Sequence, residues 1–269
     1  MTTAILDQNG ILNLNDQLDI DEFITTPMFF WELFNNIESS REQTLIQFLR
    51  QIVDKITVTN KSITCEKLEI ESKSHKDLSD FINLENTAFI RESLKKSENP
   101  ITNIRDKLAF EFTKDNFKER YSDLAEEGWI PKLKSQFGKF KNANDRQKFR
   151  EGFEKIDQTV TFEMFKETLS VCFGLLEKHD FSHEEIVLFI KQPTVIYNRA
   201  FCHVAIFEYR STQTSYKKNA LPNDSKDIDY LFCAHLVDQV FGGDQLMNNI
   251  FSHLKKSYQI LADTETGLD

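Results

Sequence analysis

Residues 3–7 read TAILD, a short apolar run that ends in an acid, as a buried strand does at the edge of a sheet. Residues 239–244 read QVFGGD: an apolar stretch, two glycines that turn the chain, and an aspartate suited to the start of a helix. A third short strand, FIT at 23–25, leads into a helix that begins at Pro27. Strand, turn and helix at both ends of the chain predict an α/β fold with a parallel sheet.

Between these ends the sequence is typical of helices. From about residue 27 to residue 207 it is charged and poor in glycine, with apolar side chains at helical spacing. Residues 56–71 alternate weakly, which leaves a short hairpin or a loop open there. Helices are predicted around 77–97, 101–113, 145–156 and 161–178, then after a capping box at Ser182 and from Pro193.

These patterns predict how the chain is divided. We expect a small parallel sheet built from both chain ends, residues 1–50 with 193–269. A large, mostly α-helical insert is expected at 51–192. No repeat at a fixed period is visible in the sequence.

Composition narrows the class of protein. The 269 residues include 33 Lys and Arg against 43 Asp and Glu, a formal net charge of −10, and 40% are hydrophobic. This excludes a disordered or low-complexity chain. No apolar run approaches the roughly 20 residues that span a bilayer, and the first residues lack the basic segment of a secretion signal. We therefore expect a cytoplasmic protein with no membrane partner.

Four acids fall where the predicted strands end or the following helices begin: Asp7, Glu32, Asp227 and Asp244. Ligands of an open parallel sheet bind at the carboxyl ends of the strands, so these side chains are expected to converge. Converging carboxylates repel one another unless a cation holds them, and hard oxygen ligands suit Mg²⁺ or Mn²⁺. Three of these acids also have an ordinary explanation, since Asp227 and Asp244 are good helix N-caps and Glu32 could face solvent. Asp7 is the hardest to dismiss, because an acid that ends a buried strand is costly without a partner.

Three segments together resemble the PIN-like nucleases. AILDQNGILNL (4–14) is similar to their first motif, an acid after strand one followed by a polar residue and Asn. FITTPMFFWELF (23–34) resembles their second segment, with a strand, a Thr/Pro helix start and an inward Glu. NDSKDIDYLFCAHLVDQVFGGD (223–244) is similar to the third, in which an Asp opens a helix and further acids flank the last core strand. The resemblance covers roughly the first 50 and the last 60 residues.

The resemblance implies a divalent-metal-dependent nuclease, in most family members an endoribonuclease. The catalytic metal ligands would be Asp7, Glu32, Asp227 and Asp244, holding a water that hydrolyses a phosphodiester bond of RNA or structured DNA. It also implies Asn9 and Asn223 as supporting groups and Asp229 and Asp238 as alternates. Family members often dimerise, so a homodimer is open. The helical stretch between the motifs is longer than in minimal family members. This leaves an alternative open, a catalytically inactive PIN-like protein whose helical insert binds a protein partner.

One segment runs against the overall acidity. Residues 132–150 contain seven Lys and Arg and one Asp, a local charge of +6, so the rest of the chain carries −16. Aromatic residues between cations suit a bound single strand, so this segment is a candidate nucleic-acid surface. The alternative is that Phe137, Phe140 and Phe149 form the buried stripe of a helix with a basic wet face. The basic residues are Lys132, Lys134, Lys139, Lys141, Arg146, Lys148 and Arg150.

Overall fold

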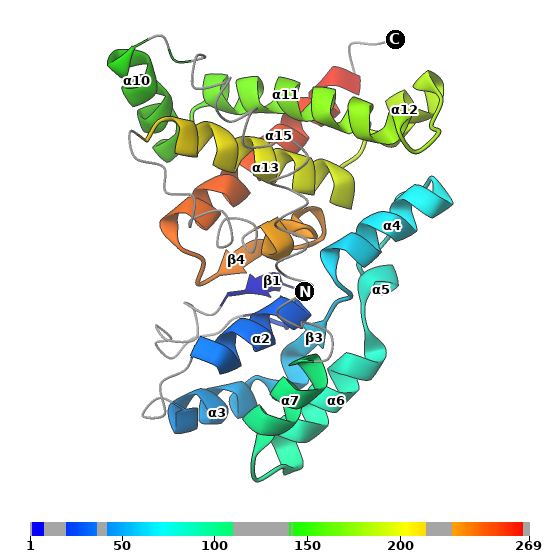
Figure 1. Ribbon diagram of the computed structural model, residues 1–269, viewed down its shortest axis with the longest axis vertical. Coiled ribbons are helices and arrows are strands. Elements are labelled where there is room, and N and C mark those ends of the chain that lie inside the picture. Colours follow the sequence, from blue (N-terminus) through cyan, green and yellow to red (C-terminus); the bar gives the residue numbers. More distant parts are fainter. Residues whose placement is uncertain are drawn as a thin grey trace.

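The computed structural model of the protein describes residues 2–7, 20–36, 42–109, 140, 142–213 and 228–265. Within these ranges the fold is mixed α/β, with one small sheet and many helices (Figure 1). The α/β prediction is confirmed at this level. None of the described helices is both long enough and apolar enough to cross a bilayer.

Over the described residues the sheet has four strands, all parallel, in the order β3-β2-β1-β4. Ile5 of β1 lies opposite Ile24 of β2 on one side and Val240 of β4 on the other. From β1 the chain adds β2 and β3 on one side and later returns to add β4 on the other. The strands are β1 (Thr3–Leu6), β2 (Glu22–Thr25), β3 (Ile56–Val58) and β4 (Gln239–Phe241).

The third strand differs from the sequence prediction. Residues 56–71 form neither a hairpin nor a loop: β3 pairs parallel with β2, and α4 (Ser62–Ser72) follows it. The outer edge of β3 is covered by α6, because Thr87 Oγ1 bonds the Val58 N–H and the Arg91 Nε–H donates to the Ile56 carbonyl. The sheet therefore includes a strand from inside the range predicted as the insert.

A group of helices packs around this sheet and forms with it what we call the sheet half (Figure 1). The predicted start of α2 is confirmed, since the Thr26 Oγ1 accepts the Phe29 N–H at 3.3 Å and Pro27 is the first helical residue. The buried Phe29 and Phe30 fix this helix on the sheet. The helices are α2 (Pro27–Asn36), α3 (Glu42–Gln51), α5 (Leu78–Phe81), α6 (Leu84–Lys96) and α7 (Pro100–Ala109), with a 3-10 turn, η1 (Val53–Lys55), before β3.

A second group of helices forms the helical half, in the upper part of Figure 1. The predicted capping box is present: the Ser182 Oγ accepts the Glu185 N–H, and the Glu185 carboxylate accepts the Ser182 N–H. Phe153 lies at the centre of the helical half. The centroid of its ring is 4.8 Å from the ring centroids of Tyr209 and His253. The helices are α10 (Ala143–Glu154), α11 (Gln158–Glu177), α12 (His183–Phe189), α13 (Val195–Ser211) and α15 (Gln245–Glu265).

Candidate functional site

The carboxyl edge of the sheet places Asp7 beside the end of β4. The Asp7 N–H donates to the Phe241 carbonyl at 3.0 Å, and the Asp7 side chain is only 5% exposed. The strand order turns between β1 and β4, since the chain grows outward from β1 on one side and β4 lies on the other. In open α/β sheets the crevice at this turning point is where ligands bind.

Two glycines, Gly242 and Gly243, form the turn between β4 and the next helix at this edge of the sheet. Gly242 has φ 89°, a left-handed conformation that costs little without a Cβ. A Cβ on Gly243 would lie 3.0 Å from Val240 Cγ1 and 3.1 Å from the Met247 sulfur, so the next helix packs against this backbone. The turn thus brings Asp244 to the carboxyl edge at the start of α15.

Asp244 is an N-cap as well as a candidate ligand. Its Oδ1 accepts the Met247 N–H at 2.8 Å, and its carbonyl accepts the Asn248 N–H at 2.9 Å. The side chain is exposed. A carboxylate has two oxygens with about four acceptor positions, so capping uses only part of what Asp244 offers.

The other predicted ligands are seen in part or not at all. Glu32 belongs to α2, which begins two residues after the end of β2 at the same edge, but its side chain is not among those that the structure describes. Asp227, Asn9 and Asn223 also lie outside the described residues. Asp229 lies near this edge: it accepts a hydrogen bond from the hydroxyl of Ser62, four residues after β3.

Asp238 lies at the opposite, amino edge of the sheet. Its Oδ2 accepts the Thr3 N–H at 2.7 Å and the Thr3 hydroxyl at 3.1 Å, at the first residue of β1. The backbone hydrogen bond from Thr3 is the main reason that the pKa of Asp238 is lowered. Asp238 is therefore separated from Asp7 by the length of β1.

A charged pair that the sequence analysis did not single out lies between α4 and α13. The Arg199 guanidinium forms a salt bridge with Glu66, and both side chains are mostly buried. Burial lowers the pKa of Arg199, and the negative charge of Asp229 acts in the opposite direction. The only sequence signal was an arginine inside the apolar run VIYNRAFCHVAIF, and its partner is 133 positions earlier in the chain.

The neighbouring residue, Asn198, holds the chain just before β4. Its Nδ2 donates to the Phe232 carbonyl at 2.7 Å and contacts His235 Nδ1 at 2.6 Å, while the Tyr258 hydroxyl donates to its Oδ1. Burial lowers the pKa of His235 to about 3, so this imidazole is neutral at physiological pH. Asn198 therefore connects the helical half to the segment that leads into β4, and Arg199 connects it to α4.

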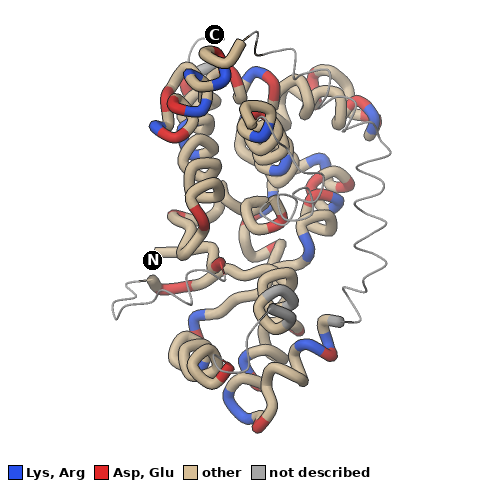
Figure 2. The backbone as a smooth tube through the Cα atoms, turned by 60° about the vertical axis from the view of Figure 1, so that its left-hand side comes forward, with Lys and Arg blue, Asp and Glu red and all other residues tan. Residues whose placement is uncertain are grey.

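The basic segment is described only from Phe140 onward, with one gap. Lys132, Lys134, Lys139 and Lys141 lie outside the described residues. Arg146, Lys148 and Arg150 belong to α10, and Arg150 donates to the Thr212 carbonyl at 3.0 Å. Phe149 is buried in α10, which confirms the core interpretation for this aromatic. Phe140 lies before the helix and is partly buried, with its ring 5.2 Å from that of Phe149. Basic and acidic residues are scattered along the described helices in Figure 2.

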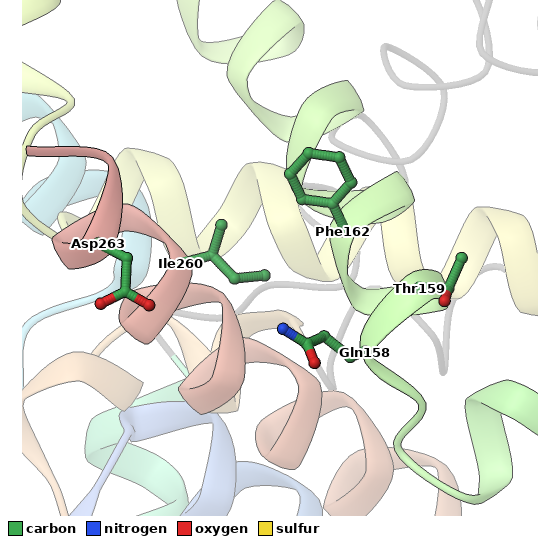
Figure 3. A pocket seen from close by; sticks show the side chains of 5 residues that line it. All are labelled: Gln158, Thr159, Phe162, Ile260 and Asp263. Atoms are coloured by element: carbon green, nitrogen blue, oxygen red, sulfur yellow. The ribbon is translucent and has the colours of Figure 1, made fainter. Parts of the chain in front are cut away.

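A pocket in the helical half is separate from this edge (Figure 3). It lies between the first turns of α11 and the last turns of α15. Ile260 is 16 residues beyond Asp244, roughly 24 Å along the helix, so the pocket contributes no residue to the sheet edge. Its lining residues are Gln158, Thr159, Phe162, Ile260 and Asp263.

Within the described part of the chain, no three or more His, Cys, Asp or Glu side chains are grouped so that they could hold a metal ion. Asp7 and Asp244 are the two predicted ligands whose side chains are described, and both offer the hard oxygens that Mg²⁺ prefers. Scans against protein-family models, curated proteins and solved structures found no match to the chain.

Proposed function

We propose that the chain is a divalent-metal-dependent nuclease with its active site at the carboxyl edge of the sheet. The observation that carries the proposal is the buried Asp7 at the end of β1, next to β4, where the strand order turns. This is the position at which open parallel sheets bind ligands. The resemblance of the strand-end segments to PIN-like nucleases adds the reaction class.

The carboxylate oxygens of the predicted site are of the kind that a hard divalent cation prefers. Asp7 and Asp244 would hold Mg²⁺ or Mn²⁺ together with Glu32 and Asp227, and Asp229 is the nearest described alternate. When bound, such an ion supplies an activated water and charge stabilisation for displacement at a phosphodiester. The protein's own part is to fix the acids: β1 and the Phe241 carbonyl hold Asp7, and the Gly242–Gly243 turn holds Asp244.

RNA is the proposed substrate, with structured DNA as the second choice. The support is the family resemblance and the local charge of +6 at 132–150, since phosphate neutralisation supplies most nucleic-acid affinity. Among the described basic residues of this segment, Arg146 and Lys148 are the candidates to contact the phosphate backbone of a nucleic acid. Arg150 already uses one N–H within the protein.

One observation favours a second candidate, an inactive PIN-like protein whose helical half binds a protein partner. In the part that the structure describes, the acids and histidines form no group of three that would hold a metal. This candidate predicts no stabilisation by Mg²⁺ or Mn²⁺ and no cleavage of any nucleic acid.

The deciding experiment is thermal unfolding in EDTA and in millimolar Mn²⁺ or Mg²⁺. Wild type is compared with Asp7→Asn and with Asp238→Asn, the same chemical change at the opposite edge. Binding to the native state at 100 times Kd would add about 2.7 kcal/mol to the free energy of unfolding. We expect a metal-dependent rise in Tm for wild type and Asp238→Asn that is absent in Asp7→Asn. No rise in wild type, or an equal rise in all three, would refute the proposed site.

A further inference from the structure

The two halves of the molecule meet along α4, and several of their contacts there are polar. Glu66 pairs with Arg199, and the Lys73 ammonium bonds both the Glu185 carboxylate, at 2.9 Å, and the Asp180 carbonyl, at 3.1 Å. Figure 1 shows α4 rising from the sheet half toward α12 and α13. These charged groups therefore help to seat α4, beside the buried Cys65.

Glu69 lies at the centre of this contact. Its side chain is fully buried, and its Oε2 accepts the Val195 N–H, at the first residue of α13, at 2.9 Å. Its Oε1 is also buried and has no hydrogen-bond partner in the described part of the chain. A buried carboxylate with one oxygen satisfied and one unsatisfied is costly when charged and much less so when protonated.

We propose that the proton on Glu69 controls how firmly α4 is seated on the N-terminus of α13, so that this contact between the halves loosens as the proton is lost. Opening the contact gives the charged carboxylate access to water. In the closed contact the carboxylate of Glu69 is buried beside the N-terminus of α13. The device responds to pH without any bound ligand.

The groups around Glu69 determine whether its carboxyl group is charged or protonated in the closed contact. The N–H groups of Val195 and Ile196 and the charge of Lys76 favour the carboxylate, but burial outweighs them and raises the pKa of Glu69 to about 8. The Arg199–Glu66 pair lies one turn before Glu69 in α4 and one turn after Val195 in α13. Cys65, on the same helix, is a buried thiol with a raised pKa, and so it stays neutral. His75 stacks on Phe189 of α12, with a pKa lowered by burial, and so it stays neutral too.

The sign of the pH dependence follows. The pKa of Glu69 is raised in the closed state to about 8 from an ordinary value of 4.5. The contact is therefore fully favoured below the ordinary pKa and weakens as pH rises toward the raised one. Linkage predicts an opening constant that rises by roughly tenfold per pH unit between these values and levels off above about pH 8.

Amide hydrogen exchange of the full chain tests this, with rates corrected for the intrinsic effect of pH. Amides of α4 and of the first turns of α13 are expected to lose protection from pH 5 to pH 8, while those of α6 serve as the reference. Glu69→Gln keeps the acceptor for Val195 without a charge and is expected to remove this pH dependence. Glu71→Gln, at an exposed position of the same helix, is the control and should behave as wild type.

Three results would overturn the proposal. The first is an equal loss of protection in α6, which would mean that the whole protein rather than this contact responds. The second is an unchanged pH slope in Glu69→Gln. The third is a carboxyl-carbon NMR titration of wild type that places Glu69 at an ordinary pKa, a measurement that stands even if the variant fails to fold.

Discussion

The two edges of the sheet use aspartate in different ways, although the same strand, β1, joins them. At the amino edge Asp21 accepts the Thr2 N–H at 2.6 Å and Asp238 accepts the Thr3 N–H at 2.7 Å, and both carboxylates are exposed. At the carboxyl edge Asp7 is buried, and Asp244 follows a glycine turn that admits no larger residue without strain.

The difference teaches how to separate a structural acid from a candidate ligand. A strand begins with N–H groups that need acceptors, and an ionised carboxylate is an acceptor only. Exposed acids at the amino edge are therefore explained by the backbone they satisfy. We propose a buried acid at the carboxyl edge, where ligands of parallel sheets bind, as a candidate cation ligand instead.

The largest expected effect is on catalysis. Asp7→Asn should lower metal-dependent cleavage of RNA by about 100-fold or more, because loss of a group that only orients a metal ligand already costs 10- to 100-fold. Asp238→Asn should leave the rate unchanged. Initial rates on a fluorogenic RNA and on a structured DNA in Mn²⁺ provide the measurement. An equal loss of cleavage rate in Asp7→Asn and Asp238→Asn would show that the acids at the two edges do not differ in function.

The turn at the carboxyl edge should be intolerant of a side chain. Gly242→Ala places a Cβ at φ 89° and should lower the free energy of unfolding by about 1–2 kcal/mol. Gly174→Ala is the matched control, since its Cβ would meet no atom within 4 Å and helix propensity favours Ala by about 0.8–1.0 kcal/mol. Urea unfolding of the two variants should shift in opposite directions. A neutral Gly242→Ala would show that the turn is not constrained as described.

Asp244 allows capping and metal binding to be separated. Asp244→Ala removes the acceptor for the Met247 N–H and should cost about 1 kcal/mol of stability, whereas Asn is as good an N-cap as Asp. Asp244→Asn should therefore keep the wild-type Tm in EDTA but show a smaller rise with Mn²⁺. If Asp244→Asn responds to Mn²⁺ as wild type does, Asp244 is a cap alone.

The smallest effect is expected at the amino edge and depends on pH. The pKa of Asp238 is lowered by the hydrogen bonds from Thr3, so its contribution is present above the ordinary pKa and is lost as pH falls through the lowered one. Because the group is exposed, wild type should exceed Asp238→Asn by only about 0.5 kcal/mol at neutral pH. Urea unfolding from pH 7 to pH 2 should bring the two proteins together in acid. A gap that widens toward acid would contradict the assignment.

Several elements could be predicted because their signals are local. TAILD and QVF gave two strands of the sheet, and Thr26-Pro27 gave the start of α2 to the residue. The capping box at Ser182 and Glu185 is equally local, since both partners lie within one turn. At the two helix starts, side chains fewer than five positions apart satisfy the backbone, and the strands show their apolar runs locally.

The rest depended on partners that are distant in the chain. The three residues of β3 are too few to distinguish a strand from a loop until β2 pairs with them and α6 covers their outer edge. Asp238 precedes β4 and Asp7 follows β1, and the parallel pairing of these two strands, which are distant in the chain, puts one acid at each edge. Ser62 with Asp229 and Glu66 with Arg199 meet across more than 100 residues. The sequence by itself determined the strands β1, β2 and β4 and most of the helices, because those signals come from neighbouring side chains. Tertiary structure alone decided which acids share an edge and which charges are buried together, because these follow from how distant segments pack.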